Sequence, residues 1–286
     1  MTENIATGYA PTWCPGCGNY GILNALKKAL ADAGLDLDRT VLVSGIGCAA
    51  KIAQYVNVYR VETLHGRTLP VATGVKLANH DLTVIAAGGD GDGMGIGMGH
   101  FIHTARRNLD IAYFIHNNQI YGLTKGQSSP TSELGAITKF TPPPLGNIER
   151  PVNIVKTAIS AGATFVARGY AGQLAELADL MVQAIRHPGF AVVDILQPCV
   201  SFNHLNTYAW YRERVKPIES FPGYDPADGE QALRLAGLWG EHIPLGVYYR
   251  EKRATFLDSL PQLAQGPLAR QPLDGIGVTR LMDELA

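Results

Sequence analysis

Short apolar runs recur along the chain with the length and composition of buried β-strands. They are rich in Val, Ile and Phe, which favour strands. The pattern predicts strands at residues 41–44, 82–87, 111–116, 164–167 and 190–196. Helical periodicity fills the stretches between them. It predicts helices at residues 22–33, 49–58, 73–79, 97–107, 152–161 and 171–186, the first with Asn19 as a candidate cap.

The alternation of strands and helices predicts an α/β fold with a mainly parallel sheet and helices on both faces. In such folds, ligands bind at the carboxyl ends of the strands. We expect this domain to span residues 1–199. Residues 200–286 are expected to form a C-terminal extension, packed on the domain or on a partner subunit, with a helix at 229–238. Four prolines between 141 and 151 predict a loop.

Composition and charge narrow the classes of function. With 286 residues, 46% of them hydrophobic, the chain can bury an ordinary globular core. The formal net charge of -1 gives no electrostatic basis for binding nucleic acid or an anionic membrane. No apolar run approaches the roughly 18 residues of a spanning helix, and the N-terminus lacks the pattern of a secretory signal. We therefore expect a cytoplasmic protein.

Two motifs follow neighbouring predicted strands and suggest a metal–diphosphate site. The first is GGDGDG at 88–93, and the second is NNQIYG at 117–122. Magnesium and calcium prefer hard oxygen ligands, which the Asp90 carboxylate, the Asn118 amide and the Ile120 carbonyl can supply. Glycines around Asp90 let backbone amides approach a diphosphate. Two ordinary glycine-rich turns are the alternative, and the absence of a GxGxxG pattern with a distant acidic residue disfavours nicotinamide binding.

Four cysteines allow several kinds of site. Cys14 and Cys17 form a CxxC pair, Cys48 follows the first predicted strand, and Cys199 follows the last one. An iron–sulfur cluster would use all four thiolates. A zinc site usually has a second CxxC, and a thioredoxin-like dithiol would leave two cysteines unused. Spacing alone leaves the cluster, zinc and unrelated cysteines open.

Several strings, taken together, resemble the β subunits of 2-oxoacid:ferredoxin oxidoreductases. They are CPGCG at 14–18, GIGC at 45–48, LHGR at 64–67, GGDGDG at 88–93 and NNQIYGLTKGQ at 117–127. The resemblance implies a thiamine diphosphate-binding fold with Mg2+ held by Asp90, Asn118 and the Ile120 carbonyl. It also implies a [4Fe–4S] cluster on Cys14, Cys17, Cys48 and Cys199. The other residues that it places at the cofactor are Ile46, Gly47, His65, Gly89, Gly91, Asp92, Gly93, Gly122, Leu123 and Thr124.

The same resemblance implies the reaction and the partners. The reaction is coenzyme A-dependent oxidative decarboxylation of a 2-oxoacid, with single electrons leaving through the cluster to ferredoxin, and it is reversible in principle. The chain looks like the diphosphate-binding half of such an enzyme. We therefore expect an α subunit that supplies the glutamate activating the cofactor, in an αβ or (αβ)2 complex.

Two lysines favour 2-oxoglutarate as the substrate. Lys51 and Lys125 can pair with a distal carboxylate, whereas pyruvate-type relatives resemble this loop with glycine in place of Lys125. We expect these lysines and His65 to act in catalysis. A pyruvate or branched-chain 2-oxoacid oxidoreductase is the alternative enzyme. A non-catalytic iron–sulfur electron-transfer subunit and a zinc-stabilised assembly subunit are alternatives of other classes.

Overall fold

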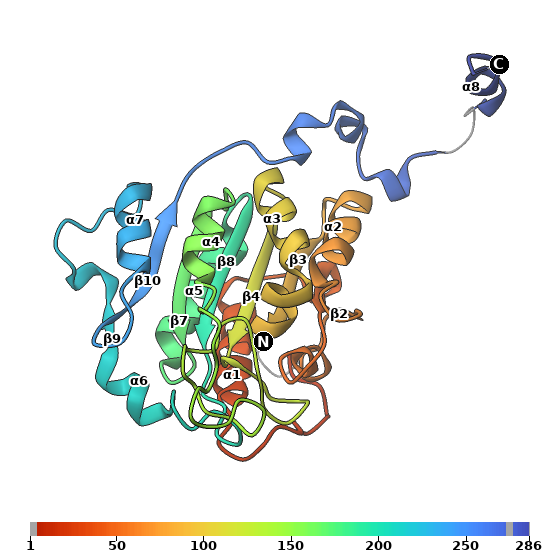
Figure 1. The fold of residues 1–286 in the computed structure, drawn as a ribbon. Helices are drawn as coiled ribbons and strands as arrows, with labels where there is room; N and C mark the ends of the chain where they lie inside the picture. Colours follow the sequence, from red (N-terminus) through yellow and green to blue (C-terminus); the bar gives the residue numbers. More distant parts are fainter. Residues whose placement is uncertain (1–4, 273–276, 286) are drawn as a thin grey trace.

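Eight strands form one sheet in the order β2-β1-β3-β4-β8-β7-β10-β9 in the computed structural model, which describes residues 5–272 and 277–285 (Figure 1). The bounds are β1 Thr40–Ser44, β2 Tyr59–Glu62, β3 Thr83–Gly89, β4 Ile111–Asn117, β7 Phe165–Tyr170, β8 Phe190–Leu196, β9 Val215–Pro217 and β10 Ile243–Arg250. All neighbours pair in parallel except β10, which runs antiparallel to β7. The five predicted strands and the mainly parallel sheet are confirmed.

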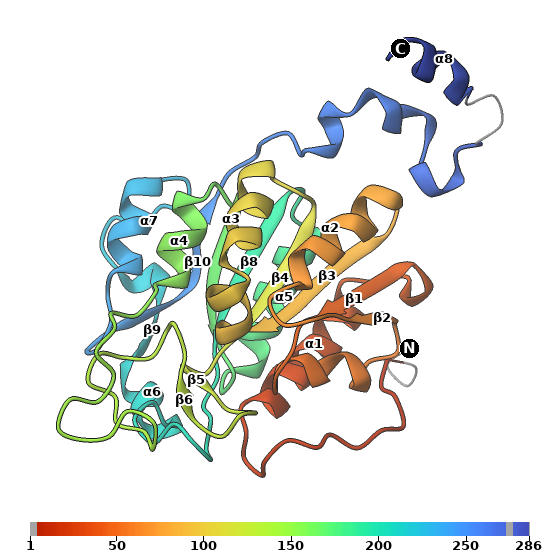
Figure 2. The same ribbon diagram turned by 45° about the vertical axis from the view of Figure 1, so that its right-hand side comes forward.

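Helices cover both faces of the sheet, as expected, and the last helix of the chain lies apart from it (Figure 2). Their bounds are α1 Asn19–Asp32, α2 Thr68–Ala78, α3 Met98–Arg107, α4 Ile154–Ser160, α5 Leu174–Arg186, α6 Tyr208–Arg214, α7 Gly229–Ala236 and α8 Val278–Asp283. Because successive strand residues point to opposite faces, the core divides into two clusters. Ile85 and Phe114 pack with α1 and α5, whereas Ala86 and Tyr113 pack with α2, α3, α4 and α7.

Two local predictions were wrong. Residues 49–58 do not form an α-helix, since only the 3-10 helix η2, Ala50–Tyr55, lies there. Asn19 does not cap α1, because Gly18 occupies the cap position and the Asn19 side chain is fully buried against His116. Strand β2 was missed because it lies at the edge of the sheet with all four residues exposed, so it carries no apolar run.

The segment after residue 199 takes part in the sheet and then runs along one end of it. Strand β10 pairs with β7, matching Gly246 to Arg168, and β9 pairs with β10. From β10 the chain passes over the end of the sheet that lies away from the loop of residues 118–150 (Figure 2). Among the described residues, no helix has both the length and the apolarity needed to cross a membrane.

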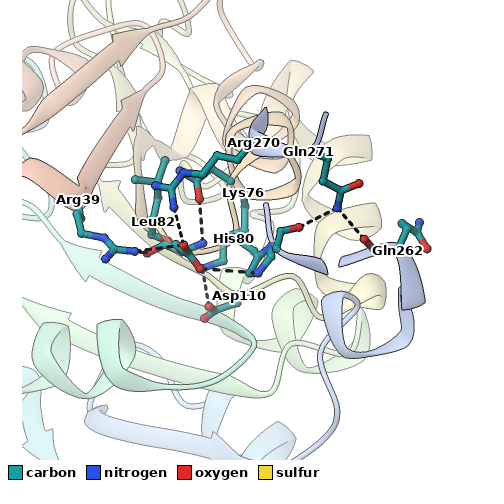
Figure 3. A network of polar contacts seen from close by, with 11 residues as sticks. Arg39, Lys76, His80, Leu82, Asp110, Gln262, Arg270 and Gln271 are labelled. Atoms are coloured by element: carbon teal, nitrogen blue, oxygen red, sulfur yellow. Dashed lines mark hydrogen bonds and ion pairs between the residues drawn. The ribbon is translucent and has the colours of Figure 1, made fainter. Parts of the chain in front are cut away.

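A polar network attaches this C-terminal segment to the domain (Figure 3). The Arg270 guanidinium lies 3.3 Å from the Asp81 carboxylate, and Arg39 approaches the same carboxylate at 3.4 Å. Beside them, the buried Lys76 ammonium pairs with Asp110 at 2.8 Å and donates to the Leu82 carbonyl at 2.9 Å. Residues near 270 are therefore held against the turn that precedes β3.

Candidate functional site

An open pocket of about 500 Å³ lies at the carboxyl ends of β1, β3 and β4. Parallel strands end at one edge of a sheet, so their terminal loops meet there. The predicted residues that line it are Ile46, Gly47, Cys48, His65, Gly89, Asp90, Gly91, Asp92, Asn118, Ile120, Gly122, Leu123 and Thr124. Gly93 does not line it, because it packs against Tyr113, whose hydroxyl would overlap an added Cβ. Ala49, His116 and Tyr121 also line the pocket and were not predicted.

Asp90 lies directly after β3, with only 1% of its surface exposed. The hydroxyls of Ser129 and Thr131 each donate to its Oδ2 atom at 2.5 Å. Burial raises the pKa of the Asp90 carboxyl to about 6, although hydrogen bonds from the two hydroxyls and nearby backbone amides oppose this shift. A cation beside Asp90 would relieve the cost of burying its charge, so the site favours a metal ion.

Asn118 and Ile120 line the same pocket as Asp90. They lie at the start of a hairpin formed by β5, Ile120–Tyr121, and β6, Gln127–Ser128. The Asn118 Oδ1 atom accepts a hydrogen bond from the Ile120 amide at 3.1 Å, which fixes the turn after β4. The hairpin loop carries Gly122, Leu123 and Thr124 into the pocket. The two motifs are thus brought together as predicted.

Asp92 lines the same pocket, and its carboxylate accepts several hydrogen bonds from the loops around it. Its Oδ1 atom accepts from the Gly66 amide at 2.8 Å, from His65 Nδ1 at 2.9 Å and from the Ile46 amide at 3.2 Å. Its Oδ2 atom accepts from the Thr68 hydroxyl at 3.1 Å. Asp92 therefore joins the loop after β1 to the loop before α2, and it orients the imidazole of His65 at the pocket edge.

Gly45 explains why the first of these loops can approach so closely. A Cβ atom at Gly45 would overlap Asp92 Oδ2 and would lie 2.6 Å from the Thr68 hydroxyl. No side chain fits at that distance, so the loop after β1 requires glycine there.

All four cysteines line a second pocket beside the first, although they come from three distant parts of the sequence. They are free thiols, and Cys14 is exposed while the others are buried or half-buried. A Cβ at Gly122 would lie 3.6 Å from Cys199 Sγ and 3.7 Å from Cys48 Sγ. Gly122 therefore lies between the thiols and the first pocket, where it adds no side chain to separate them.

The surroundings of the thiols disfavour uncompensated thiolates. Burial, together with the charges of the other three cysteines, raises the pKa of Cys17 to about 11, and burial also raises the pKa values of Cys48 and Cys199. Gln197 donates to Cys17 Sγ at 3.4 Å, and the Trp13 indole donates to the Cys48 carbonyl at 2.7 Å. Positive iron centres would stabilise the thiolates that burial alone disfavours.

The structure places both candidate lysines at the cysteine pocket and not at the cofactor pocket. Lys51 donates to the Thr12 hydroxyl at 3.2 Å, and its charge lowers the pKa of Cys48 against the larger effect of burial. Lys125 is exposed on the hairpin loop with a φ of 75°, a left-handed conformation that glycine adopts more easily.

Sequence reasoning missed the groups that support Asp90 from behind. These are Ser129, Thr131 and, further away, an ion pair between Arg168 and Asp194 with both side chains almost fully buried. A signal existed, because Arg168 and Asp194 interrupt two of the most apolar strands. Charged residues at such positions are buried only when they are paired.

Across residues 5–272 and 277–285, no group of three or more His, Cys, Asp or Glu side chains could hold a single metal ion in the present arrangement. The predicted magnesium ligands include only one carboxylate, with an amide and a backbone carbonyl.

Comparison with known proteins identifies the family of this chain. A model described as "Thiamine pyrophosphate enzyme, C-terminal TPP binding domain" matches residues 45–195, and one for the C-terminal part of the pyruvate ferredoxin oxidoreductase beta subunit matches residues 199–265. The 2-oxoacid:ferredoxin oxidoreductase subunit beta of a Sulfolobus species is 46% identical over 251 residues, covering 84% of this chain and 82% of that protein. The 2-oxoglutarate synthase subunit KorB of Archaeoglobus fulgidus is 43% identical over 218 residues, covering 76% and 77%.

A solved structure agrees with these relatives over the whole chain. It is the 2-oxoglutarate:ferredoxin oxidoreductase from Magnetococcus marinus with 2-oxoglutarate, coenzyme A and succinyl-CoA bound. The TM-score is 0.90 at 37% identity, and the match covers 100% of this chain and 96% of that one. The predicted thiamine diphosphate-binding fold is thereby confirmed.

Proposed function

The chain belongs to the β subunits of the 2-oxoacid:ferredoxin oxidoreductases, and from this premise we propose that it works with an α subunit to convert 2-oxoglutarate, coenzyme A and ferredoxin to succinyl-CoA, CO2 and reduced ferredoxin. The observation that carries the proposal is the pairing of two adjoining pockets. One holds the Asp90 and Asn118 motifs, and the other holds four free cysteines.

The first pocket fits Mg2+ and the diphosphate of thiamine diphosphate. Asp90, Asn118 and the Ile120 carbonyl would hold the metal, because they offer three hard oxygen ligands at one end of the sheet. Gly89 and Gly122 line the pocket without side chains and leave room for a diphosphate, whereas the Tyr121 ring occupies the space beside Gly91. The diphosphate oxygens would complete the coordination.

The second pocket fits a [4Fe–4S] cluster. Cys14, Cys17, Cys48 and Cys199 supply the four thiolates that such a cluster needs.

The bound groups would divide the chemistry between them: thiamine diphosphate supplies carbanion stabilisation for decarboxylation, and the cluster supplies single-electron transfer toward ferredoxin. The residues of this chain bind and orient. His65, held by Asp92, presents its imidazole at the pocket edge. Lys51 and Lys125 stand at the rim of the cysteine pocket, where either ammonium can attract the distal carboxylate of a dicarboxylic 2-oxoacid.

Several parts of the reaction fall outside this chain. We propose that the pocket is closed by an α subunit, which supplies the glutamate that activates the cofactor, and that ferredoxin accepts electrons from the cluster. The KorB relative and the bound 2-oxoglutarate of the Magnetococcus marinus enzyme support 2-oxoglutarate as the substrate. We propose a cytoplasmic αβ or (αβ)2 complex.

The test is anaerobic co-purification of this chain with its α subunit, followed by quantitation of iron, sulfide, zinc and thiamine. We expect about four irons per β chain, as one [4Fe–4S] cluster requires, and one bound thiamine diphosphate. Asp90→Ala should abolish metal-dependent thiamine binding and leave the iron content unchanged. Asp228→Ala, which removes an exposed carboxylate that caps α7, is the matched control. Tight thiamine binding by Asp90→Ala would refute the ligand assignment, and zinc without iron would refute the cluster.

A further inference from the structure

A chain of buried polar contacts runs from Asp90 across the sheet to β10. It begins at Thr131, whose hydroxyl lies 2.5 Å from Asp90 Oδ2 and 3.1 Å from Asn117 Oδ1. Thr131 and Asn117 are 1% and 4% exposed. The Thr131 hydroxyl has one proton, which these two acceptors share, with the shorter contact to Asp90; the contact with Asn117, the residue before Asn118, is therefore the weakest link.

The next two bonds cross from β4 to β8 and β7. The Asn117 amide donates to Asp194 Oδ1 at 2.9 Å, and Arg168 Nε donates to Asp194 Oδ2 at 2.9 Å. Arg168 and Asp194 are directly paired in the sheet register, so their side chains stand side by side on one face. Asp194 therefore accepts one bond on each carboxylate oxygen and cannot turn without breaking one of them.

Strand β10 completes the chain. Arg168 Nη1 donates to the Tyr248 hydroxyl at 3.0 Å, and that hydroxyl donates to the Pro244 carbonyl at 2.6 Å. The Arg168 guanidinium also lies 5.3 Å from the centre of the Tyr248 ring. Burial raises the pKa of Tyr248 to about 12, so its hydroxyl keeps its proton and remains a donor at neutral pH.

This arrangement costs more than packing requires. A buried ion pair is expensive to desolvate, and apolar residues of similar size often stabilise a sheet as well or better. The position of the Arg168–Asp194 pair, in the chain of contacts that leads to Asp90, suggests a role at the metal site. Both hydroxyls on Asp90 approach Oδ2, and the backbone amides of Gly91 and Asn118 also donate to the carboxylate, so its orientation is fixed. A carboxylate held in this way presents its oxygens to a metal in a fixed orientation, and outer partners of that kind tune metal affinity.

We propose that Tyr248, Arg168, Asp194 and Asn117 are positioning residues that fix the Asp90 carboxylate through Thr131, so that strand β10 contributes to the affinity for the divalent metal. The inference rests on the proposed function, since it needs Asp90 to be a metal ligand. It gives the strand contributed by the C-terminal segment a role in cofactor binding, although this strand does not line the cofactor pocket.

The test measures binding of Mn2+ to the purified αβ complex in the presence of thiamine diphosphate, by electron paramagnetic resonance of the free ion. Tyr248→Phe removes the remote hydroxyl and keeps the ring beside Arg168. Thr131→Val removes the hydroxyl next to Asp90. Loss of an outer partner typically weakens metal binding about 10–100-fold. We expect about tenfold or more for Thr131→Val, and about threefold to tenfold for the remote Tyr248→Phe.

The control is Tyr224→Phe. The Tyr224 hydroxyl donates to the Val247 carbonyl at 2.6 Å, so this variant also loses one hydrogen bond to β10, but outside the chain of bonds. It should bind Mn2+ within twofold of the wild type. The cluster absorbance of each complex shows that it has assembled.

The outcomes distinguish failure of the positioning chain from failure of the assignment of Asp90 as a metal ligand. Wild-type Mn2+ affinity in an assembled Tyr248→Phe or Thr131→Val complex overturns the positioning chain. Equal weakening by Tyr248→Phe and Tyr224→Phe overturns it as well, because general loosening of β10 would then suffice. If Tyr248→Phe does not assemble, Asn117→Ser, which shortens the same chain nearer the site, takes its place under the same criterion. If Asp90→Asn keeps wild-type Mn2+ affinity, the ligand assignment in the proposed function fails first.

Discussion

Replacing Asp92 by alanine removes the acceptor that joins two loops of the cofactor pocket. In the wild-type protein the carboxylate, 3% exposed, receives hydrogen bonds from Ile46, His65, Gly66 and Thr68. The alanine variant leaves two backbone amides and one hydroxyl without this acceptor. We expect the loop after β1 and the loop before α2 to lose their fixed spacing.

The size of the effect follows from these bonds. A hydrogen bond to a charged group contributes about 1.5–3 kcal/mol, and the contributions within one cluster are not additive. We expect a total loss of about 3–5 kcal/mol in the stability of this region. Thiamine diphosphate must order the loosened loops when it binds. If this ordering costs about half of the lost stabilisation free energy, the affinity for thiamine diphosphate falls about tenfold to a hundredfold. Asp92→Asn keeps an oxygen at the Oδ1 position for Ile46, His65 and Gly66. Its affinity for thiamine diphosphate should therefore fall by no more than about threefold.

The assay is titration of thiamine diphosphate into the αβ complex with saturating Mg2+, followed by calorimetry. Asp228→Ala again serves as the control for an unrelated carboxylate. The reasoning would be refuted by wild-type affinity in Asp92→Ala. It would also fail if Asn and Ala variants lost affinity equally, since that result would mean that the charge itself, and not the acceptor geometry, binds the cofactor or its metal.

Two further predictions concern Lys125 and His187. Lys125 has a left-handed backbone conformation, which costs a residue with a side chain about 1 kcal/mol. The Lys125→Gly complex should therefore be at least as stable as the wild type, while its KM for 2-oxoglutarate should rise far more than its KM for pyruvate. Equal changes in the two KM values would contradict the proposed role of Lys125 in substrate choice. Burial lowers the pKa of His187 from 6.5 to about 4, and Nε2 lies 2.8 Å from the Thr164 hydroxyl. The unfolded chain therefore takes up this proton first, so the contribution to stability is complete above pH 6.5 and is lost as the pH falls toward 4. Because solvent screens the partly exposed ring, the loss at pH 5 should be about 1–2 kcal/mol. His187→Gln should abolish this part of the pH dependence in thermal unfolding of the complex, whereas the same change at the exposed His204 should leave it intact.

The pocket residues could be predicted because their motifs end strands that are neighbours in the sheet. Asp90 follows β3 and Asn118 follows β4, and these two strands pair directly. The carboxyl ends of parallel strands meet at one edge, so two local patterns were enough to place Asp90 and Asn118 in one pocket. The same logic brought Cys48 and Cys199, each after a strand, toward the same end.

The supporting groups could not be predicted in this way. Thr131 reaches Asp90 only because the hairpin of β5 and β6 folds back, and the sequence of that hairpin carries no strong strand pattern. The pair of Arg168 and Asp194 depends on β7 lying beside β8, and the contact with Tyr248 depends on β10 joining antiparallel. The order of strands in a sheet follows from packing of the whole chain, and local periodicity does not encode it.

The two pockets share a wall, and this sharing accounts for the placement of several residues at once. Cys48, Asn118, Gly122 and Leu123 line both of them. Cys48 stands on the same loop as Ile46, which Asp92 holds, and Gly122 stands on the same hairpin as the Ile120 carbonyl. Residues of the first pocket and of the cysteine pocket thus lie within two positions of each other along the chain. With the proposed thiamine diphosphate in one pocket and the proposed cluster in the other, this common wall would keep the two groups adjacent, as single-electron transfer between them requires; a simple decarboxylase would need no such neighbour.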